Sequence, residues 1–143
     1  MSISAIRHTI TRLYQEGWGK GNLDVVDEVF ASEHILHWNE LSPTDQHRTT
    51  EEVKQIISNY RTAFPDLIVV VDDIVVEAER AAVQVTFIGT HTGVYEGFAP
   101  TNKKSRFTDM QILRIHNGKI TESSLGSGGL PYFFSILDGS AFR

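Results

Sequence analysis

Apolar residues in the first part of the chain recur at steps of three and four positions. This spacing predicts an amphipathic helix over residues 3–18. The run Gly19-Lys20-Gly21-Asn22 ends it, because glycine and asparagine suit the left-handed conformation of a helix C-cap. A second, short helix is predicted over residues 23–30. A third begins with Thr49-Thr50-Glu51-Glu52, which has capping-box spacing, and ends before Pro65.

Later in the chain the pattern changes to runs of β-branched and aromatic residues, which are typical of strands. Four strands are predicted, over residues 67–77, 81–92, 104–116 and 119–124. Asn117-Gly118 is a strong signal for a type I′ hairpin turn. Because helices precede a long meander, the predicted fold class is α+β: a curved, mixed or antiparallel sheet wrapped as a cone around N-terminal helices. The open end of such a cone is a natural ligand pocket.

The composition is that of an ordinary globular chain and narrows the function classes. The 143 residues suit one domain, taken as 1–143. A net charge of −5 without any basic run argues against a nucleic-acid partner, and the absence of cysteine excludes disulfides, thiolate catalysis and cysteine-ligated zinc. We see neither a secretory signal nor the roughly 18 apolar residues of a membrane span. We therefore expect a cytoplasmic protein without membrane contact.

Six short motifs follow one another in a characteristic order. They are Gly21-Asn22-Leu23-Asp24, His37, Ala63-Phe64-Pro65-Asp66-Leu67, Gly89-Thr90-His91-Thr92-Gly93, Gly97-Phe98-Ala99-Pro100-Thr101 and Leu113-Arg114-Ile115-His116-Asn117-Gly118-Lys119-Ile120-Thr121-Glu122. Together they resemble the SnoaL-like polyketide cyclase family of the nuclear transport factor 2-like superfamily. The resemblance implies an α+β cone with a deep pocket, a homodimer formed through the outer face of the sheet, and no metal or organic cofactor. It also implies cyclase, isomerase or hydrolase chemistry of the acid–base type on a hydrophobic oxygenated small molecule such as a polyketide.

One feature departs from the family pattern. Relatives usually follow the Gly-Lys-Ile-x-Glu strand with a Trp and, about four residues further on, an Asp that transfers protons. Here the matching positions are Ser124 and, within a residue, Gly128, and residues 123–129 contain no carboxylate. A serine hydroxyl has far too high a pKa to abstract a proton unaided. Two function classes therefore stay open: an enzyme with another proton-transfer residue, and a non-catalytic binding or accessory protein of the same fold.

Asp109 is the first candidate for the catalytic role. Aspartate is disfavoured inside strands, and period-two alternation places it on one face with Phe107, Gln111 and Leu113. If this face lines the cavity, Asp109 lies beside Gln111, a predicted substrate-binding residue. Burial would then raise the pKa of Asp109 towards a value useful for acid–base catalysis. Alternatively, Asp109 faces solvent or a dimer interface and pairs with Arg106 or a lysine.

His37 is the second catalytic candidate, because an imidazole transfers protons near neutral pH. The alternative is a structural histidine that fixes the loop after the second helix. His34 and His37 lack a third ligand nearby in sequence, so we expect no metal. His91 is expected to bond a turn at the end of its strand.

Five further residues are predicted to bind substrate together with Gln111. Tyr14 matches the tyrosine that relatives place on the first helix, where Trp18 shares its apolar face and core packing is the alternative. Trp38 and Asn39 are expected near the mouth of the cavity. Phe98 is expected to form part of a lid over it.

Overall fold

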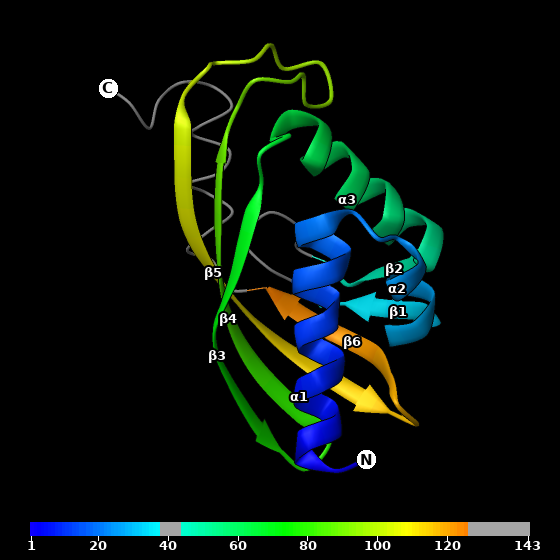
Figure 1. Cartoon of the computed structure of the whole chain (residues 1–143). Helices are drawn as coiled ribbons and strands as arrows, with labels where there is room; N and C mark the ends of the chain where they lie inside the picture. Colours follow the sequence, from blue (N-terminus) through cyan, green and yellow to red (C-terminus); the bar gives the residue numbers. More distant parts are fainter. Residues whose placement is uncertain (38–43, 126–143) are drawn as a thin grey trace.

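The chain folds into helices and one open sheet (Figure 1). In a computed structural model, the described residues are 1–37 and 44–125, without the side chain of Leu125. Within these ranges the elements follow the order α1, η1, α2, β1, β2, α3, β3, β4, β5 and β6. The strands form a six-stranded sheet in the order β2-β1-β6-β5-β4-β3.

The first helix is continuous, as the pattern predicts, but it changes form midway. α1 (Ile3–Arg12) is α-helical and η1 (Leu13–Trp18) has the wider π form. Gly21 adopts a φ of 73° after the helix, in agreement with the predicted left-handed cap. The guanidinium of Arg61 donates to two carbonyl oxygens at the end of η1, each at 2.8 Å. The C-terminal end of the first helix is thereby fixed against α3.

The other two helices lie where the sequence predicts them. α2 (Asp24–Val29) is short and buries its valines, and α3 (Thr50–Ala63) buries one stripe of its surface. The hydroxyl of Thr49 accepts a hydrogen bond from the amide of Glu52 at 3.2 Å, which confirms the predicted cap.

Between α2 and α3 lie two strands that the pattern does not predict, β1 (Phe30–Leu36) and β2 (Gln46–Thr49). β1 shows no regular alternation because its register against β6 shifts between Phe30 and Ile35. β2 has four residues, none of them fully buried. β1 runs parallel to β6, whereas the other neighbouring strands are antiparallel, so the sheet is mixed.

The four long strands match their predicted runs closely. They are β3 (Ile68–Glu77), β4 (Arg80–Thr90), β5 (Lys104–His116) and β6 (Lys119–Leu125). Asn117-Gly118 joins the last two with φ angles of 50° and 77°, as a type I′ turn requires.

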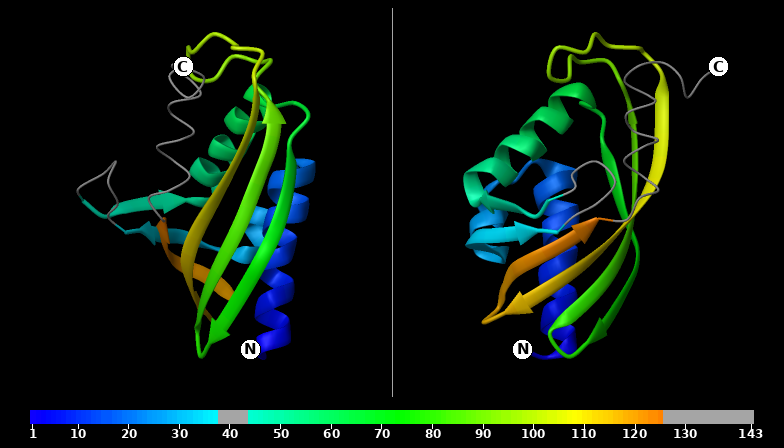
Figure 2. Two further views of the ribbon diagram at one scale, coloured as in Figure 1. Left: turned by 90° about the vertical axis from the view of Figure 1, so that its left-hand side faces the viewer. Right: turned by 180° about the vertical axis from the view of Figure 1, so that it is seen from behind.

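The sheet is strongly curved, and the helices lie on its concave side. Figure 2 shows α1 running along the long strands, while α3 crosses the sheet nearer the other end. Apolar side chains from all three helices meet the inner face of the sheet in one core, which includes Ile10, Val26, Ile57, Val83 and Leu113. The predicted fold class, an α+β cone with a mixed sheet around helices, is confirmed. In the described part of the chain, no helix combines the length and apolarity needed to cross a membrane.

Two of the sequence motifs meet where α3 ends and β4 ends. The amide and hydroxyl of Thr90 both donate to the carboxylate of Asp66, each at 2.8 Å. The amide of Gly93 donates to the carbonyl oxygen of Ala63 at 3.1 Å. A β-carbon at position 93 would collide with the carbonyl oxygen of Thr62. The Phe-Pro-Asp and Gly-Thr-His-Thr-Gly motifs therefore form one joint, which requires glycine at its closest approach.

Candidate functional site

The π-helical turn η1 carries Tyr14 on the side that faces the sheet. The Tyr14 side chain is 2% exposed, and its hydroxyl donates a hydrogen bond to Oε1 of Gln111 on β5 at 3.0 Å. π-Helical turns are often found at functional sites because they re-aim side chains within a helix. Two residues predicted to bind substrate are thus in direct contact.

Asp109 lies on the same strand and the same face as Gln111. Its exposed fraction is 7%, and it stands opposite the buried Val85 of β4. Burial raises the pKa of Asp109 from its ordinary value of 3.8 to about 6, although hydrogen bonds from the Met110 amide and the Gln111 side chain partly oppose this. The Met110 amide is 2.9 Å from Oδ1. A carboxylate so placed exchanges its proton near neutral pH.

An aromatic cluster borders the carboxylate. Phe107, two positions before Asp109, stacks on Phe87 with ring centres 5.2 Å apart. Tyr60 of α3 lies within 5.8 Å of Phe87 and 6.3 Å of Phe107 between ring centres. Trp18 meets Phe87 edge-on at 5.6 Å. The structure therefore brings Trp18 to the same aromatic cluster of the core, on the concave side of the sheet, as the residues that flank Asp109.

The phenols near Asp109 are held in their neutral form. Burial, with the added effect of the negative charge on Asp109, raises the pKa of Tyr14 and of Tyr60. Both therefore remain hydrogen-bond donors at physiological pH. Tyr14 donates a hydrogen bond to Gln111, and the Gln111 amide in turn donates to the Asp109 carboxylate.

His37 lies away from this group. Its neighbour Leu36 is buried in the interior, and the His37 ring bonds Glu122 through Nε2 at 2.7 Å. The other carboxylate oxygen of Glu122 pairs with Arg114 at 2.8 Å, and Arg114 is exposed between the buried residues of β5. His37 thus stands on the outer face of the sheet in an ion-pair network. The structure does not bring the two catalytic candidates together.

The remaining candidates divide between exposed and undescribed positions. Phe98 is 43% exposed and shares two backbone hydrogen bonds with Tyr95 in a tight turn. The predicted substrate-binding residues Trp38 and Asn39 lie outside the described residues, and so does Gly128. His91 is buried, and its Nδ1 accepts a hydrogen bond from the Thr101 amide at 3.2 Å, an arrangement consistent with the expected structural role.

The sequence analysis did not single out Arg48 and considered His34 only as a metal ligand, whereas the structure pairs the two residues at the edge of the sheet. His34 on β1 is 4% exposed, and Arg48 on β2 stands directly opposite it. Neither strand was predicted, so the sequence offered no means of assigning these side chains to a face. Tyr60 was recognised only as part of the buried stripe of α3, because a phenol and an apolar ring occupy the same helical spacing.

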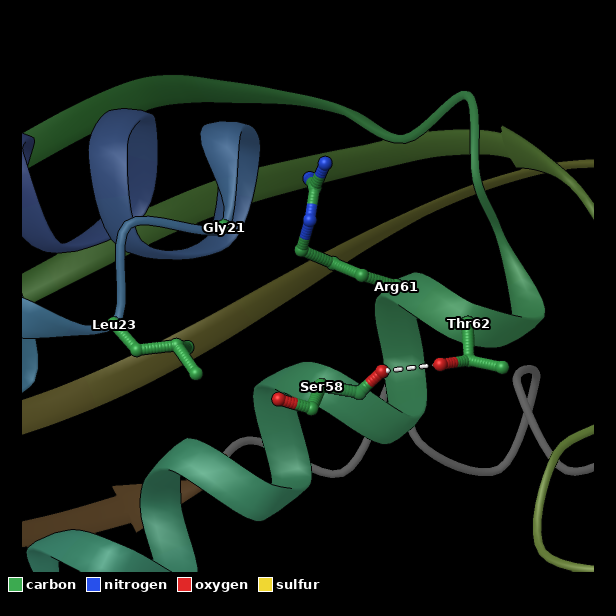
Figure 3. Close-up of a pocket in the computed structure, with 5 residues that line it drawn as sticks. All are labelled: Gly21, Leu23, Ser58, Arg61 and Thr62. Atoms are coloured by element: carbon green, nitrogen blue, oxygen red, sulfur yellow. Dashed lines mark hydrogen bonds between the residues drawn. The ribbon is translucent and has the colours of Figure 1, made fainter.

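A separate surface depression of about 300 Å³ lies between α3 and the residues that follow η1 (Figure 3). Figure 3 shows Arg61 pointing from α3 towards Gly21, and the Thr62 hydroxyl donates to the Ser58 carbonyl oxygen at 2.9 Å. Leu23 completes the lining, which contains no carboxylate or histidine. Because Arg61 is occupied by backbone carbonyls, we regard this depression as a structural joint. Among the described residues, no three histidine or acidic side chains are grouped so as to hold a metal ion.

An open mixed sheet curled around helices, with a carboxylate on its concave face, places the protein in the nuclear transport factor 2-like class of α+β cones. Within that class the chain belongs to the SnoaL-like polyketide cyclase family, whose sequence model matches residues 8–125. No curated protein sequence matches the chain.

Solved structures show the same fold. A candidate SnoaL-like polyketide cyclase from Jannaschia sp. CCS1 is 24% identical with a TM-score of 0.78, and the match covers 99% of this chain and 96% of that one. AclR, a candidate hydroxylase from Streptomyces galilaeus, is 21% identical with a TM-score of 0.77, covering 97% and 87%. IdmH, a candidate polyketide cyclase from Streptomyces antibioticus, is 24% identical with a TM-score of 0.71, covering 90% and 97%. These similarities concern the fold, which different chemistries share.

Proposed function

We propose that the protein is a cofactor-independent enzyme that performs acid–base chemistry on a hydrophobic oxygenated small molecule such as a polyketide, as a cyclase, isomerase or hydrolase. The observation that carries this proposal is the buried Asp109, whose pKa is raised to about 6. At neutral pH such a carboxylate is ionised and accepts a proton, yet its conjugate acid is strong enough to return it. The family and the aromatic cluster support a flat, hydrophobic substrate.

In the proposed reaction, Asp109 removes a proton from the carbon next to a carbonyl group. The electron pair of that C–H bond forms the carbon–carbon double bond of an enolate, and negative charge develops on the carbonyl oxygen. The Gln111 amide supplies an N–H donor for this oxygen, and the Tyr14 hydroxyl holds that amide in place through its hydrogen bond to Oε1. Asp109 then returns the proton to another carbon in an isomerisation. In a cyclisation it gives the proton to the alkoxide formed when the enolate carbon attacks a second carbonyl of the same molecule.

Proton exchange in D₂O tests this step without the natural substrate. The protein is incubated with a panel of aromatic ketones, beginning with 2-tetralone, and deuterium uptake at the carbon next to the carbonyl is followed by NMR. We expect Asp109→Asn to lower the enzyme-dependent rate by about 100-fold or more. Asp73→Asn, which removes an exposed carboxylate from β3, is the matched control and should exchange normally. Equal rates for Asp109→Asn and the unsubstituted protein would refute the proposal.

A non-catalytic binding or accessory protein is the second candidate function. It is favoured by the absence of any carboxylate in residues 123–129, where relatives carry their proton-transfer residue. The same experiment separates the two functions. A protein that binds the ketones but does not accelerate exchange is a binding module, and Asp109→Asn should then leave binding intact.

We further propose that the protein forms a homodimer through the outer face of its sheet. Ile112 of β5, Ala82 of β4 and Val75 of β3 are register neighbours on this face, and Ile112 and Val75 expose 55% and 60% of their surfaces. Met110, next along β5 on the same face, is 55% exposed. Large exposed apolar side chains on β5 and β3, with only Ala82 between them on β4, are typical of a surface covered by a partner.

A further inference from the structure

The two strands at the edge of the sheet place a histidine and an arginine side by side on the inner face. β1 and β2 are antiparallel, and His34 stands directly opposite Arg48. Paired residues in neighbouring strands point to the same side of a sheet. His34 is 4% exposed and packs on Phe30 of the core with ring centres 4.8 Å apart, so this side is the interior.

The histidine lacks a hydrogen-bond partner at one ring nitrogen, and the arginine has one side-chain partner but no paired carboxylate among the described residues. Nδ1 of His34 is buried without a hydrogen-bond partner. The half-buried Arg48 guanidinium donates to Oε1 of Gln46 at 3.2 Å, and no described carboxylate lies within ion-pair distance of it. Glu52 attracts the Arg48 guanidinium electrostatically, but the hydrogen bonds of Glu52 are to the cap residue Thr49. Buried polar groups are normally paired, so this juxtaposition requires an explanation.

A line of phenols connects this pair to the carboxylate on β5. Tyr95 is packed against the core and lies within the electrostatic field of Arg48. Tyr60 of α3 lies within the fields of both Tyr95 and Asp109. Arg48 and Asp109 are thus linked electrostatically through Tyr95 and Tyr60, and the Tyr60 ring contacts Phe87 and Phe107 of the aromatic cluster.

We propose that Arg48, together with His34, anchors an anionic oxygen group of the ligand, specifically a carboxylate, while the rest of the ligand extends over the aromatic cluster towards Asp109. This inference rests on the proposed function, because it assigns substrate recognition within the same site. A planar guanidinium matches a carboxylate with two parallel N–H donors, and the imidazole adds a third polar contact. The anchoring charge and the reacting carboxylate are kept apart, which lets Asp109 remain next to the carbonyl it acts on.

The test uses two probes of one shape, 2-naphthoate and its neutral counterpart 2-naphthamide, with binding measured by calorimetry. We expect the unsubstituted protein to prefer the naphthoate, and Arg48→Gln to weaken naphthoate binding about tenfold or more without changing naphthamide binding. Arg106→Gln removes the same charge from the exposed, outer face of β5 and is the matched control. Arg48→Lys keeps the charge and should retain part of the preference, which guards against a folding defect in the glutamine variant.

Four outcomes would decide against the inference. Equal binding of both probes by the unsubstituted protein, or equal weakening of naphthoate by Arg48→Gln and Arg106→Gln, would show that Arg48 does not anchor a carboxylate, while the proposed function survives. Loss of both probes in a folded Arg48→Gln would show a role in shaping the site only. If neither probe binds the unsubstituted protein, this inference fails, whereas the proposed function is still decided by the ketone-exchange experiment.

Discussion

Tyr14 and Gln111 are 97 positions apart in the chain, yet the Tyr14 hydroxyl donates to the Gln111 side chain at 3.0 Å. The contact joins the π-helical turn of the first helix to the middle of β5. Because the amide oxygen of Gln111 is engaged by Tyr14, its NH₂ group is directed to the other side, where Asp109 lies. The helix thus orients the amide that faces the Asp109 carboxylate.

Tyr14→Phe removes this hydrogen bond and leaves the amide oxygen of a partly buried glutamine unpaired. We expect the free energy of unfolding to fall by about 1–3 kcal/mol, measured by urea denaturation. The double variant Tyr14→Phe/Gln111→Leu should lose less than the sum of the two single variants, because both partners are then gone. Strict additivity would show that the two side chains do not interact.

The raised pKa of Asp109 makes stability depend on pH in a defined direction. The pKa of Asp109 in the folded protein, about 6, is above the ordinary 3.8 of the unfolded chain. At low pH the group is protonated in both states and does not affect stability. As pH rises, the unfolded chain releases the proton first, and the folded state is destabilised relative to it. The penalty therefore develops between these two values. A shift of about two units corresponds to about 3 kcal/mol. Relative to Asp109→Asn, the unsubstituted protein should lose up to that amount between about pH 3.5 and pH 7.

Urea unfolding of both proteins across that pH range measures the difference. Asp73→Asn, at an exposed position on the neighbouring β3, controls for the general effect of removing a carboxylate. A stability difference between Asp109→Asn and the unsubstituted protein that stays constant with pH would contradict the burial of this charge.

The sequence predicted the long elements because their patterns are strong and local. The stripe of α3, its Thr49 cap, the β5 run and the Asn117-Gly118 turn each follow from neighbouring residues. Alternation also identified the face shared by Asp109 and Gln111. It did not decide whether that face is inside, because this depends on how helices from elsewhere in the chain pack on the sheet.

The features that escaped prediction depend on long-range pairing. β1 is a strand because it lies parallel to β6, about ninety residues later, and its own irregular pattern does not show this. The juxtaposition of His34 and Arg48 follows from the pairing of β1 with β2, and it was hidden because neither strand was predicted. The position of His37 on the outer face, beside Glu122, is set by the same contact. A residue's chemistry was readable from the sequence, whereas the side of the sheet on which it acts was not.

His37 supplies a pH dependence of the opposite sign. Its pKa is raised, first by the hydrogen bond to Glu122 and also by Asp45. The ion pairs of the protonated ring therefore stabilise the fold fully below the ordinary pKa of histidine, and this contribution is lost as pH rises through the higher folded value. We expect the gap in melting temperature between the unsubstituted protein and His37→Asn to be larger at about pH 5.5 than at about pH 8.5.

NMR titration of the His37 ring provides the direct measurement, and Glu122→Gln should lower its pKa. Because His37 lies outside the interior group, His37→Asn should leave ketone exchange unchanged. A large loss of exchange in that variant would restore His37 as a catalytic residue.

The apolar outer face predicts a concentration-dependent assembly. Ile112→Lys places a charge in the middle of this face, and we expect it to convert the proposed dimer to a monomer because a buried, unpaired charge is costly at an interface. Light scattering after size-exclusion chromatography gives the mass. Gln15→Lys adds the same charge at an exposed position on η1 and should leave the mass unchanged. A monomer in the unsubstituted protein would refute the dimer proposal.

Alanine substitutions at Gly93, in the joint between α3 and β4, and at Gly17, inside the first helix, should affect stability differently. At Gly93, a β-carbon would collide with the Thr62 carbonyl oxygen, which is backbone and has little freedom to move. We expect Gly93→Ala to lower the free energy of unfolding by about 2–4 kcal/mol. At Gly17, inside the helix, a β-carbon would meet only Leu13 Cδ1 at 3.6 Å, an ordinary contact. There alanine should be neutral or stabilise by up to about 1 kcal/mol, because it restricts the unfolded chain and favours helix. Urea unfolding of the two variants compares them directly, and similar stabilities would show that the joint has more space than its geometry indicates.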